Sequence, residues 1–226
     1  MKQVGLFFGT FNPFHNGHLF MANYCLNECD IDEVWIIVSP QNPLNKNLEI
    51  LDIYERIKII DKSISSKENI KVCLDELKLP KPNYTISTLR FLKKTYSKNK
   101  FIIILGEDNL HSFKKWKNSR DILDNFSIYI YPRNDKINAS DLITHDNLKI
   151  LRTAPKIDIS STEIRDYLSK GFNVRKYLPN DSFEYILENK FYKNHKSDKR
   201  LLNLYVIFFL DQLSRLGNVF FNFPLL

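Results

Sequence analysis

The chain has 226 residues, enough for one domain of ordinary size, and its 43% hydrophobic and 26% charged residues exclude wholesale disorder. No apolar run is long enough for a transmembrane helix, and the N-terminus lacks the apolar core of a signal peptide. The net charge is +7, and positions 193–226 account for +3 of it, with five basic and two acidic residues. The rest of the chain is only mildly basic, which gives little support to a dedicated nucleic-acid surface.

Short apolar segments alternate with longer amphipathic ones. Strands are predicted at 4–8, 34–38, 101–105 and 127–131, with one more near Ile150, and helices at 17–28, 51–65 and 85–96. The first three strands are continuously apolar, which is typical of central strands in a parallel sheet covered on both faces. This β-α-β-α order predicts an α/β fold with a doubly wound parallel sheet and helices on both faces.

The last third of the chain is less regular. Residues 159–168, ISSTEIRDYL, carry a helix start signal, with Ser160 or Ser161 as the cap and Glu163 following. Residues 132–147 are polar and rich in turn formers, which predicts a long loop. The apolar stretch 201–226 leaves a docked helix, a dimer contact and an unstructured extension open, and we expect an appendage that the chemistry does not need.

Polar clusters follow the predicted strands. In doubly wound folds, ligands bind beyond the carboxyl ends of the strands, where the strand order reverses. Four polar clusters are expected at this edge: after the strands at 4–8, 34–38 and 101–105, and before the late helix. The sequence therefore predicts one binding site built from several loops.

The stretch GTFNPFHNGH, residues 9–18, follows the first strand. Gly9 is expected to let the chain turn sharply and a ligand approach the backbone, and Thr10 can donate to phosphate oxygens. Gly17 and His18 would open the next helix, whose N-terminus favours an anion, and His15 can converge with His18 on one phosphoryl group. Incidental histidines in a turn are the alternative, and a zinc site is a weaker one because no third ligand lies near in the sequence.

The residues at the start of the late predicted helix could bind an anion. Ser161, Thr162 and the helix N-terminus lie one turn before Arg165. Hydroxyls, unpaired amides and a guanidinium together form a polyphosphate clamp. An ordinary capped surface helix would explain SSTE alone.

The stretch GTFNPFHNGH resembles the signature of the nucleotidylyltransferase superfamily, whose members carry a His-x-Gly-His element after the first strand of a Rossmann-like sheet. With SPQNPLNK (39–46), PNYTISTL (82–89), LGEDNLHSFKKWKN (105–118), YPR (131–133) and ISSTEIR (159–165), the chain resembles bacterial nicotinate-nucleotide adenylyltransferases over about residues 2–192. The resemblance implies a nucleotidylyltransferase domain at 1–192, with 193–226 an extension of unknown role. It also implies adenylyl transfer from ATP to nicotinate mononucleotide in NAD biosynthesis, which gives deamido-NAD and pyrophosphate.

The resemblance also implies site residues. For ATP these are Gly9, Thr10, Phe11, His15, His18, Gly106, Asp108, Ile159, Ser160, Ser161, Thr162 and Arg165, with His15, His18 and Arg165 catalytic. Asp108 would lie near a ribose, or instead cap the short helix that follows. For the mononucleotide they are Asn42, Lys46, Thr85, Trp116 and Arg133. Trp116 would stack on the nicotinate ring, with a core position as the alternative, and Thr85 would meet the pyridine carboxylate.

The expected partners are ATP and nicotinate mononucleotide, without nucleic acid or membrane, and a homo-oligomer is left open. The acceptor is already a phosphate anion, so no general base is required. Mg²⁺ would bridge phosphate oxygens, largely held by water, because the motifs hold no dedicated carboxylate cage. Three cysteines, an odd number without a secretion signal, predict a reducing cytoplasm.

Two other functions stay open at this point. The first is the same chemistry with phosphopantetheine or nicotinamide mononucleotide as acceptor, which a pyrophosphate assay with each acceptor would distinguish. The second is a catalytically silent nucleotide- or RNA-binding module, which would be retained on nucleic acid with a steep salt dependence and release no pyrophosphate.

Overall fold

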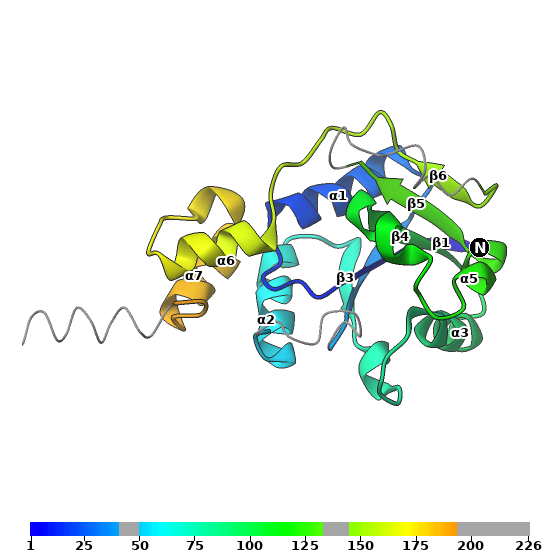
Figure 1. The fold of residues 1–226 in the computed structure, drawn as a ribbon, viewed down its shortest axis with the longest axis horizontal. Helices are drawn as coiled ribbons and strands as arrows, with labels where there is room; N and C mark the ends of the chain where they lie inside the picture. The colour runs from blue at the N-terminus through cyan, green and yellow to red at the C-terminus, as the bar shows by residue number, and fades with distance from the viewer. Residues whose placement is uncertain (41–49, 133–144, 194–226) are drawn as a thin grey trace, which may run out of the picture.

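The computed structural model describes residues 1–40, 50–132 and 145–193. In this part of the chain, one parallel sheet has the strand order β3-β2-β1-β4-β5-β6 (Figure 1). The strands are β1 (Lys2–Gly9), β2 (Glu33–Val38), β3 (Ile70–Cys73), β4 (Asn99–Gly106), β5 (Ser127–Tyr131) and β6 (Leu148–Ile150). This order is that of a Rossmann-like doubly wound sheet, and the predicted fold class is confirmed.

The helices are α1 (Asn16–Glu28), α2 (Ile53–Ile64), α3 (Thr85–Thr95), α4 (Leu110–Phe113), α5 (Ser119–Asn125), α6 (Ser161–Ser169) and α7 (Asn180–Glu188). Short 3₁₀ turns are η1 (Asp75–Lys78), η2 (Glu107–Asn109) and η4 (Arg175–Tyr177). The three predicted early helices agree with α1, α2 and α3 to within two residues at each end. The strand β3 and the helices α5 and α7 were not predicted.

Alternate residues of the central strands enter two separate cores. Leu6 of β1 and Ile37 of β2 join the core that includes Leu89 of α3, whereas Phe7 of β1 joins the core that includes Cys25 of α1. Because side chains alternate across a strand, continuous apolar runs are needed when both faces are covered. The middle parts of the central strands are therefore continuously apolar because helices cover both faces of the sheet.

The C-terminal helices of the described part lie beside α2 rather than over the middle of the sheet (Figure 1). The hydroxyl of Tyr185 in α7 donates to Glu55 of α2 at 2.6 Å, and the ammonium of Lys62 lies 5.1 Å from the centre of the Tyr185 ring. Ile164 of α6 and Ile186 of α7 are buried in the same core as α1 and α2. This packing brings the start of α6 next to the loop between β1 and α1.

The strand order reverses between β1 and β4, which are neighbours in the sheet although β2 and β3 lie between them in sequence. The chain leaves β1 toward β2 on one side and enters β5 from β4 on the other. A crevice is expected at the carboxyl ends of β1 and β4 in such a fold. Within the described residues, no helix has both the length and the hydrophobicity to cross a bilayer.

Candidate functional site

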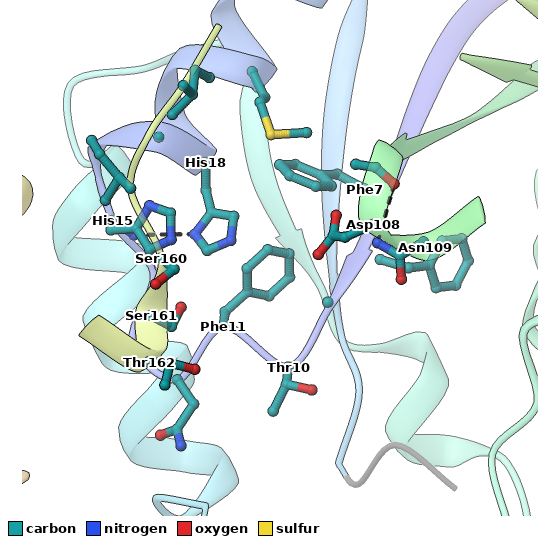
Figure 2. A pocket seen from close by; sticks show the side chains of 18 of the residues that line it. Phe7, Thr10, Phe11, His15, His18, Asp108, Asn109, Ser160, Ser161 and Thr162 are labelled. Carbon is teal, nitrogen blue, oxygen red and sulfur yellow. Dashed lines mark hydrogen bonds between the residues drawn. The ribbon is translucent and has the colours of Figure 1, made fainter. Parts of the chain in front are cut away.

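A cavity of about 300 Å³ opens at the carboxyl ends of β1 and β4 (Figure 2). Its walls come from the β1–α1 loop, the start of α1, the turn after β4 and the segment that enters α6. All twelve residues predicted to bind ATP line this cavity: Gly9, Thr10, Phe11, His15, His18, Gly106, Asp108, Ile159, Ser160, Ser161, Thr162 and Arg165. The structure therefore brings together residues up to 156 positions apart in the chain (9 to 165).

The β1–α1 loop turns at Phe11 and not at Gly9. Phe11 has a φ of 48°, in the left-handed region that non-glycine residues seldom adopt, whereas Gly9 ends β1 without a positive φ. A Cβ on Gly9 would lie 2.7 Å from the Phe11 ring, so the missing side chain makes room for that ring. The expectation that Gly9 makes the sharp turn was wrong, and the space above it holds an aromatic side chain.

His15 and His18 form a stacked pair at the start of α1. Their ring centres lie 3.6 Å apart with 26° between the planes, and Figure 2 shows both beside Ser160. The backbone N–H of His15 donates to Nδ1 of His18 at 3.3 Å. An Nδ1 that accepts a hydrogen bond carries no proton, so a neutral His18 has its proton on Nε2.

Aromatic rings enclose His18 on its other sides. Phe11 meets it edge-on at 5.0 Å between ring centres, Phe7 edge-on at 5.9 Å, and Phe14 lies tilted at 5.3 Å. His15 is buried, with 2% of its surface exposed, while His18 is half-buried and lines the cavity. The His18 ring is therefore held firmly, with its orientation set by packing and by one backbone hydrogen bond.

Gly17 allows two segments to approach the start of α1. A Cβ at this position would lie 2.8 Å from Cγ2 of Ile157 and 3.0 Å from the ring of His15. Ile157 belongs to the extended segment that leads to Ser160 and α6. The glycine between the two histidines thus permits His15 to fold over the helix and the later segment to close the cavity.

Carbonyl groups of the β1–α1 loop are occupied by donors from distant parts of the chain. Arg165 donates through Nη1 to the Asn12 carbonyl at 2.7 Å, and the Ser161 hydroxyl donates to the Pro13 carbonyl at 2.9 Å. The Tyr192 hydroxyl donates to Oδ1 of Asn12 at 2.8 Å. The start of α6 and the end of the described chain therefore fix the shape of this loop.

The N-terminus of α6 faces the same cavity. Of the two predicted caps, Ser160 is the N-cap, and its Oγ accepts from the backbone N–H of Glu163 at 3.2 Å. Arg165 also donates through Nη2 to Oγ1 of Thr162 at 3.3 Å. Hydroxyls, a guanidinium and the positive end of a helix are here on one wall, an arrangement that favours anions.

The turn after β4 supplies the opposite wall. A Cβ on Gly106 would lie 2.6 Å from Oδ1 of Asp108, so the glycine allows the carboxylate to fold back toward the end of the strand. Asp108 is exposed and lines the cavity (Figure 2). Asn109 donates from its side chain to the Gly106 carbonyl at 3.4 Å.

The residues predicted for the mononucleotide are less well placed. Thr85 is the first residue of α3, and Trp116 is half-buried with its ring 5.2 Å from that of Phe113; neither lines the 300 Å³ cavity. Trp116 packs against the core and keeps an exposed part, and its stacking on a nicotinate ring stays a prediction. Asn42, Lys46 and Arg133 lie outside the described residues.

Tyr131 at the end of β5 also lines the cavity, although no role was predicted for it. Its hydroxyl donates to the Pro155 carbonyl at 2.6 Å, which anchors the segment leading to Ile157 and α6. Burial, followed by the nearby Tyr24, raises the pKa of Tyr131 to about 12. The motif YPR was noted, but nothing local indicated that its tyrosine contacts a carbonyl 24 residues later.

The donor set of the cavity fits a metal that arrives with phosphate better than one held by the protein alone. Among the described residues, no group of three or more His, Cys, Asp or Glu side chains is placed to hold an ion. Asp108 is the carboxylate that lines the cavity, beside hydroxyls and the two histidines. The phosphate oxygens of a bound nucleotide would complete an oxygen-rich set, which Mg²⁺ prefers.

The chain is similar to known proteins over most of its length. The cytidylyltransferase-like family model matches residues 6–167. A chain from Cytophaga hutchinsonii named probable nicotinate-nucleotide adenylyltransferase is 40% identical over 193 residues, covering 85% of this chain and 100% of the relative. One of the same name from Christiangramia forsetii is 43% identical over 195 residues, covering 85% and 99%.

The fold is also similar to that of solved structures. Nicotinic acid mononucleotide adenylyltransferase from Plasmodium falciparum, complexed with NaAD, superposes with a TM-score of 0.72 at 21% identity. The superposition covers 85% of this chain and 98% of that one.

Proposed function

The chain belongs to the cytidylyltransferase-like family, among its nicotinate-nucleotide adenylyltransferases, and we propose that the cavity at the ends of β1 and β4 is its reaction site. The reaction is adenylyl transfer from ATP to nicotinate mononucleotide, which gives nicotinate adenine dinucleotide and pyrophosphate in NAD biosynthesis. One observation supports the location above all others: the twelve residues predicted for ATP, from three separate segments (9–18, 106–108 and 159–165), line one cavity at the point where the strand order reverses.

The chemistry requires alignment more than proton transfer. A phosphate oxygen of the mononucleotide forms a bond to the α-phosphorus of ATP, while the bond from that phosphorus to the bridging oxygen breaks and its electron pair leaves with pyrophosphate. The attacking oxygen is already anionic, so the protein's task is to position the reactants and to stabilise the migrating negative charge.

We propose that His18 donates a hydrogen bond from Nε2 to the reacting phosphates. Its Nδ1 is occupied by the backbone N–H of His15, so the neutral ring keeps its proton on the other nitrogen. His15 stacks on His18 at 3.6 Å and supports its orientation. Arg165 and the hydroxyls at the start of α6 would hold the outgoing pyrophosphate, since they form the cationic wall of the cavity.

A divalent metal cofactor accompanies the nucleotidyltransferase family, and we propose that it is Mg²⁺ bound with ATP. When bound, it would neutralise charge on the phosphate oxygens. Those oxygens and water would be its main ligands, because the described residues contain no three-residue ligand cluster. The chain's own contribution is to orient the nucleotide through the β1–α1 loop, Asp108 and the start of α6.

We extend the proposal to the remaining partners and to the location of the protein. Trp116, Thr85, Asn42, Lys46 and Arg133 are proposed to contact the mononucleotide, and neither nucleic acid nor membrane is proposed as a partner. The catalytic domain is proposed to span residues 1–192, with 193–226 as an extension. Cys25, Cys29 and Cys73 are free thiols, which supports a reducing cytoplasm.

Substitutions at His18 test the site directly. His18→Ala should lower kcat by about 10²-fold or more, the scale of losing one charge-stabilising donor. His18→Gln places an amide near the former Nε2 and should retain more activity than His18→Asn, whose amide is near the former Nδ1. Pyrophosphate release from ATP and nicotinate mononucleotide measures kcat, and circular dichroism checks the fold.

The comparison of the two amides provides the control. An Asn variant as active as the Gln variant would contradict donation from Nε2. Near-wild-type turnover in His18→Ala would remove His18 from the reaction. Parallel assays with nicotinamide mononucleotide and phosphopantetheine test the acceptor, and faster turnover of either would contradict the proposed substrate.

A further inference from the structure

Arg56 of α2 is a buried cation that the reaction described above does not use. Its side chain is 1% exposed, and among the described residues it forms no ion pair with a carboxylate. Arginine is rarely buried unless it is paired, because removing a charge from water is costly. Burial accordingly lowers the pKa of this guanidinium, with nearby Tyr192 and Asp52 opposing the shift.

The guanidinium is satisfied instead by four backbone carbonyls. Nη1 donates to the carbonyls of Thr10 and Ser39, Nη2 donates to that of Pro40 at 3.0 Å, and Nε donates to that of Leu51 at 2.9 Å. These bonds use four of the five N–H donors of the side chain. A planar fork with donors in fixed directions is suited to holding several acceptors in one geometry.

The four carbonyls belong to three separate segments. Thr10 is in the β1–α1 loop and lines the cavity, Ser39 and Pro40 follow β2, and Leu51 lies just before α2. Pro40 and Leu51 flank positions 41–49, which carry Asn42 and Lys46, two residues predicted for the mononucleotide. Arg56 thus fixes both flanks of that stretch relative to the wall of the nucleotide cavity.

Ser39 is held from further directions. Its backbone N–H donates to the Gly9 carbonyl at 3.0 Å, and its side chain forms a hydrogen bond with the buried carboxyl of Glu76. Glu76 also accepts from Oγ1 of Thr88 in α3 at 2.9 Å. The end of β2 is therefore connected by hydrogen bonds to the end of β1, to α2 and to α3.

We propose that Arg56 is a positioning residue that sets the separation between the ATP side and the acceptor side of the site. The inference rests on the proposed function, since only a two-substrate transfer requires this separation. In-line attack needs the acceptor oxygen about 3–3.5 Å from the α-phosphorus, and a misplacement of about 1 Å caused far from the chemistry costs about 10²-fold in rate. Arg56 does not line the 300 Å³ cavity, and it acts through the carbonyls that it holds.

Two variants separate positioning from charge and from stability. Arg56→Ala removes the fork and the charge, while Arg56→Lys keeps the charge on a flexible stem that cannot reproduce four directed bonds. Arg90→Ala is the matched control, because Arg90 in α3 is an exposed arginine paired with Asp121 away from the cavity. Each protein is assayed for pyrophosphate release, and calorimetry gives the dissociation constant of ATP.

Chemical rescue supplies a measurement that a merely structural residue would not affect. Millimolar guanidinium ion should restore part of the kcat of folded Arg56→Ala, whereas methylammonium, which has the same charge without the planar fork, should not. We expect kcat to fall about 10²-fold in Arg56→Ala. We also expect a raised KM for the acceptor, little restoration of kcat in Arg56→Lys, and a change of less than about fivefold in the dissociation constant of ATP.

Several results would overturn the proposed role of Arg56. Folded Arg56 variants with wild-type kcat would overturn the inference, as would equal rescue by methylammonium and guanidinium. Loss of the native fold in both variants would overturn it too, because the role would then be one of stability alone. A wild-type chain without turnover would contradict the proposed function, whereas an active wild type with equally active Arg56 variants would contradict only this inference.

Discussion

Replacing Gly17 by alanine should disable the site while leaving the protein folded. The new Cβ would lie 2.8 Å from Cγ2 of Ile157 and 3.0 Å from the His15 ring. Carbon atoms in good contact lie about 3.5–4.0 Å apart, so Ile157 must move by roughly 0.7–1.2 Å. His15 is buried and stacked on His18 at 3.6 Å, so its displacement is passed to His18.

The structure allows the size of both effects to be worked out. Overpacking costs about 1–3 kcal/mol, and replacing a helical glycine returns about 0.5–1 kcal/mol, which leaves a net loss of up to about 2.5 kcal/mol. For a chain of this size, Tm should fall by up to about 10 °C. A displacement of about 1 Å at the reacting groups should lower kcat by about 10²-fold.

Gly171 offers the matched control because its φ is 78° and no atom lies within 4 Å of a Cβ built there. Gly171→Ala should lose about 1–2 kcal/mol through backbone strain and keep its kcat. Thermal unfolding and the pyrophosphate assay are measured on both variants. If Gly17→Ala keeps kcat within threefold of the wild type, close packing around this glycine does not position the histidines.

Two further predictions concern the free energy of unfolding at acid pH and the binding of the acceptor nucleotide. Glu33 is desolvated by burial, but hydrogen bonds from Lys2, Trp35 and Lys71 outweigh this and lower its pKa to about 2. Its stabilising contribution is therefore present above about pH 4.5 and is lost as the pH falls toward 2. Because both lysines are about half exposed, with side-chain exposures of 47% and 52%, Glu33→Gln should cost only about 1–2 kcal/mol at pH 7 in urea unfolding. A cost that stays unchanged at pH 3.5 would contradict this linkage. Trp116→Ala should raise KM for nicotinate mononucleotide about tenfold through lost stacking, and KM for ATP much less. Equal increases for both substrates would argue against ring stacking.

The central fold could be predicted because its signals are local. Runs such as VWIIV at 34–38 and FIIIL at 101–105 are apolar on every residue, as strands buried on both faces require. The strand β3 was missed because it has four residues at the sheet edge, with Lys71 exposed between a buried Ile70 and a half-buried Val72. Helix α7 carries no cap hydrogen bond from a side chain at its start, so no start signal marked it.

The candidate site was predictable where a motif kept its residues close in sequence. His15 and His18 are three positions apart, and the cap at Ser160 follows a known helix signal. Arg56, Tyr131 and Tyr192 were missed because each acts on backbone or amide oxygens 5 to 180 positions away, which leaves no local pattern. The family and reaction predicted from the resemblance are confirmed by the relatives.

The contact between Tyr192 and Asn12 has a consequence for how the protein is made. These residues are 180 positions apart, and the hydroxyl of Tyr192 holds the amide of the loop that begins the cavity. During synthesis the first strand leaves the ribosome long before this tyrosine does, so the loop waits for its last support until nearly the whole domain has emerged. A nascent chain halted ahead of Tyr192 would carry every histidine of the signature yet lack a finished pocket.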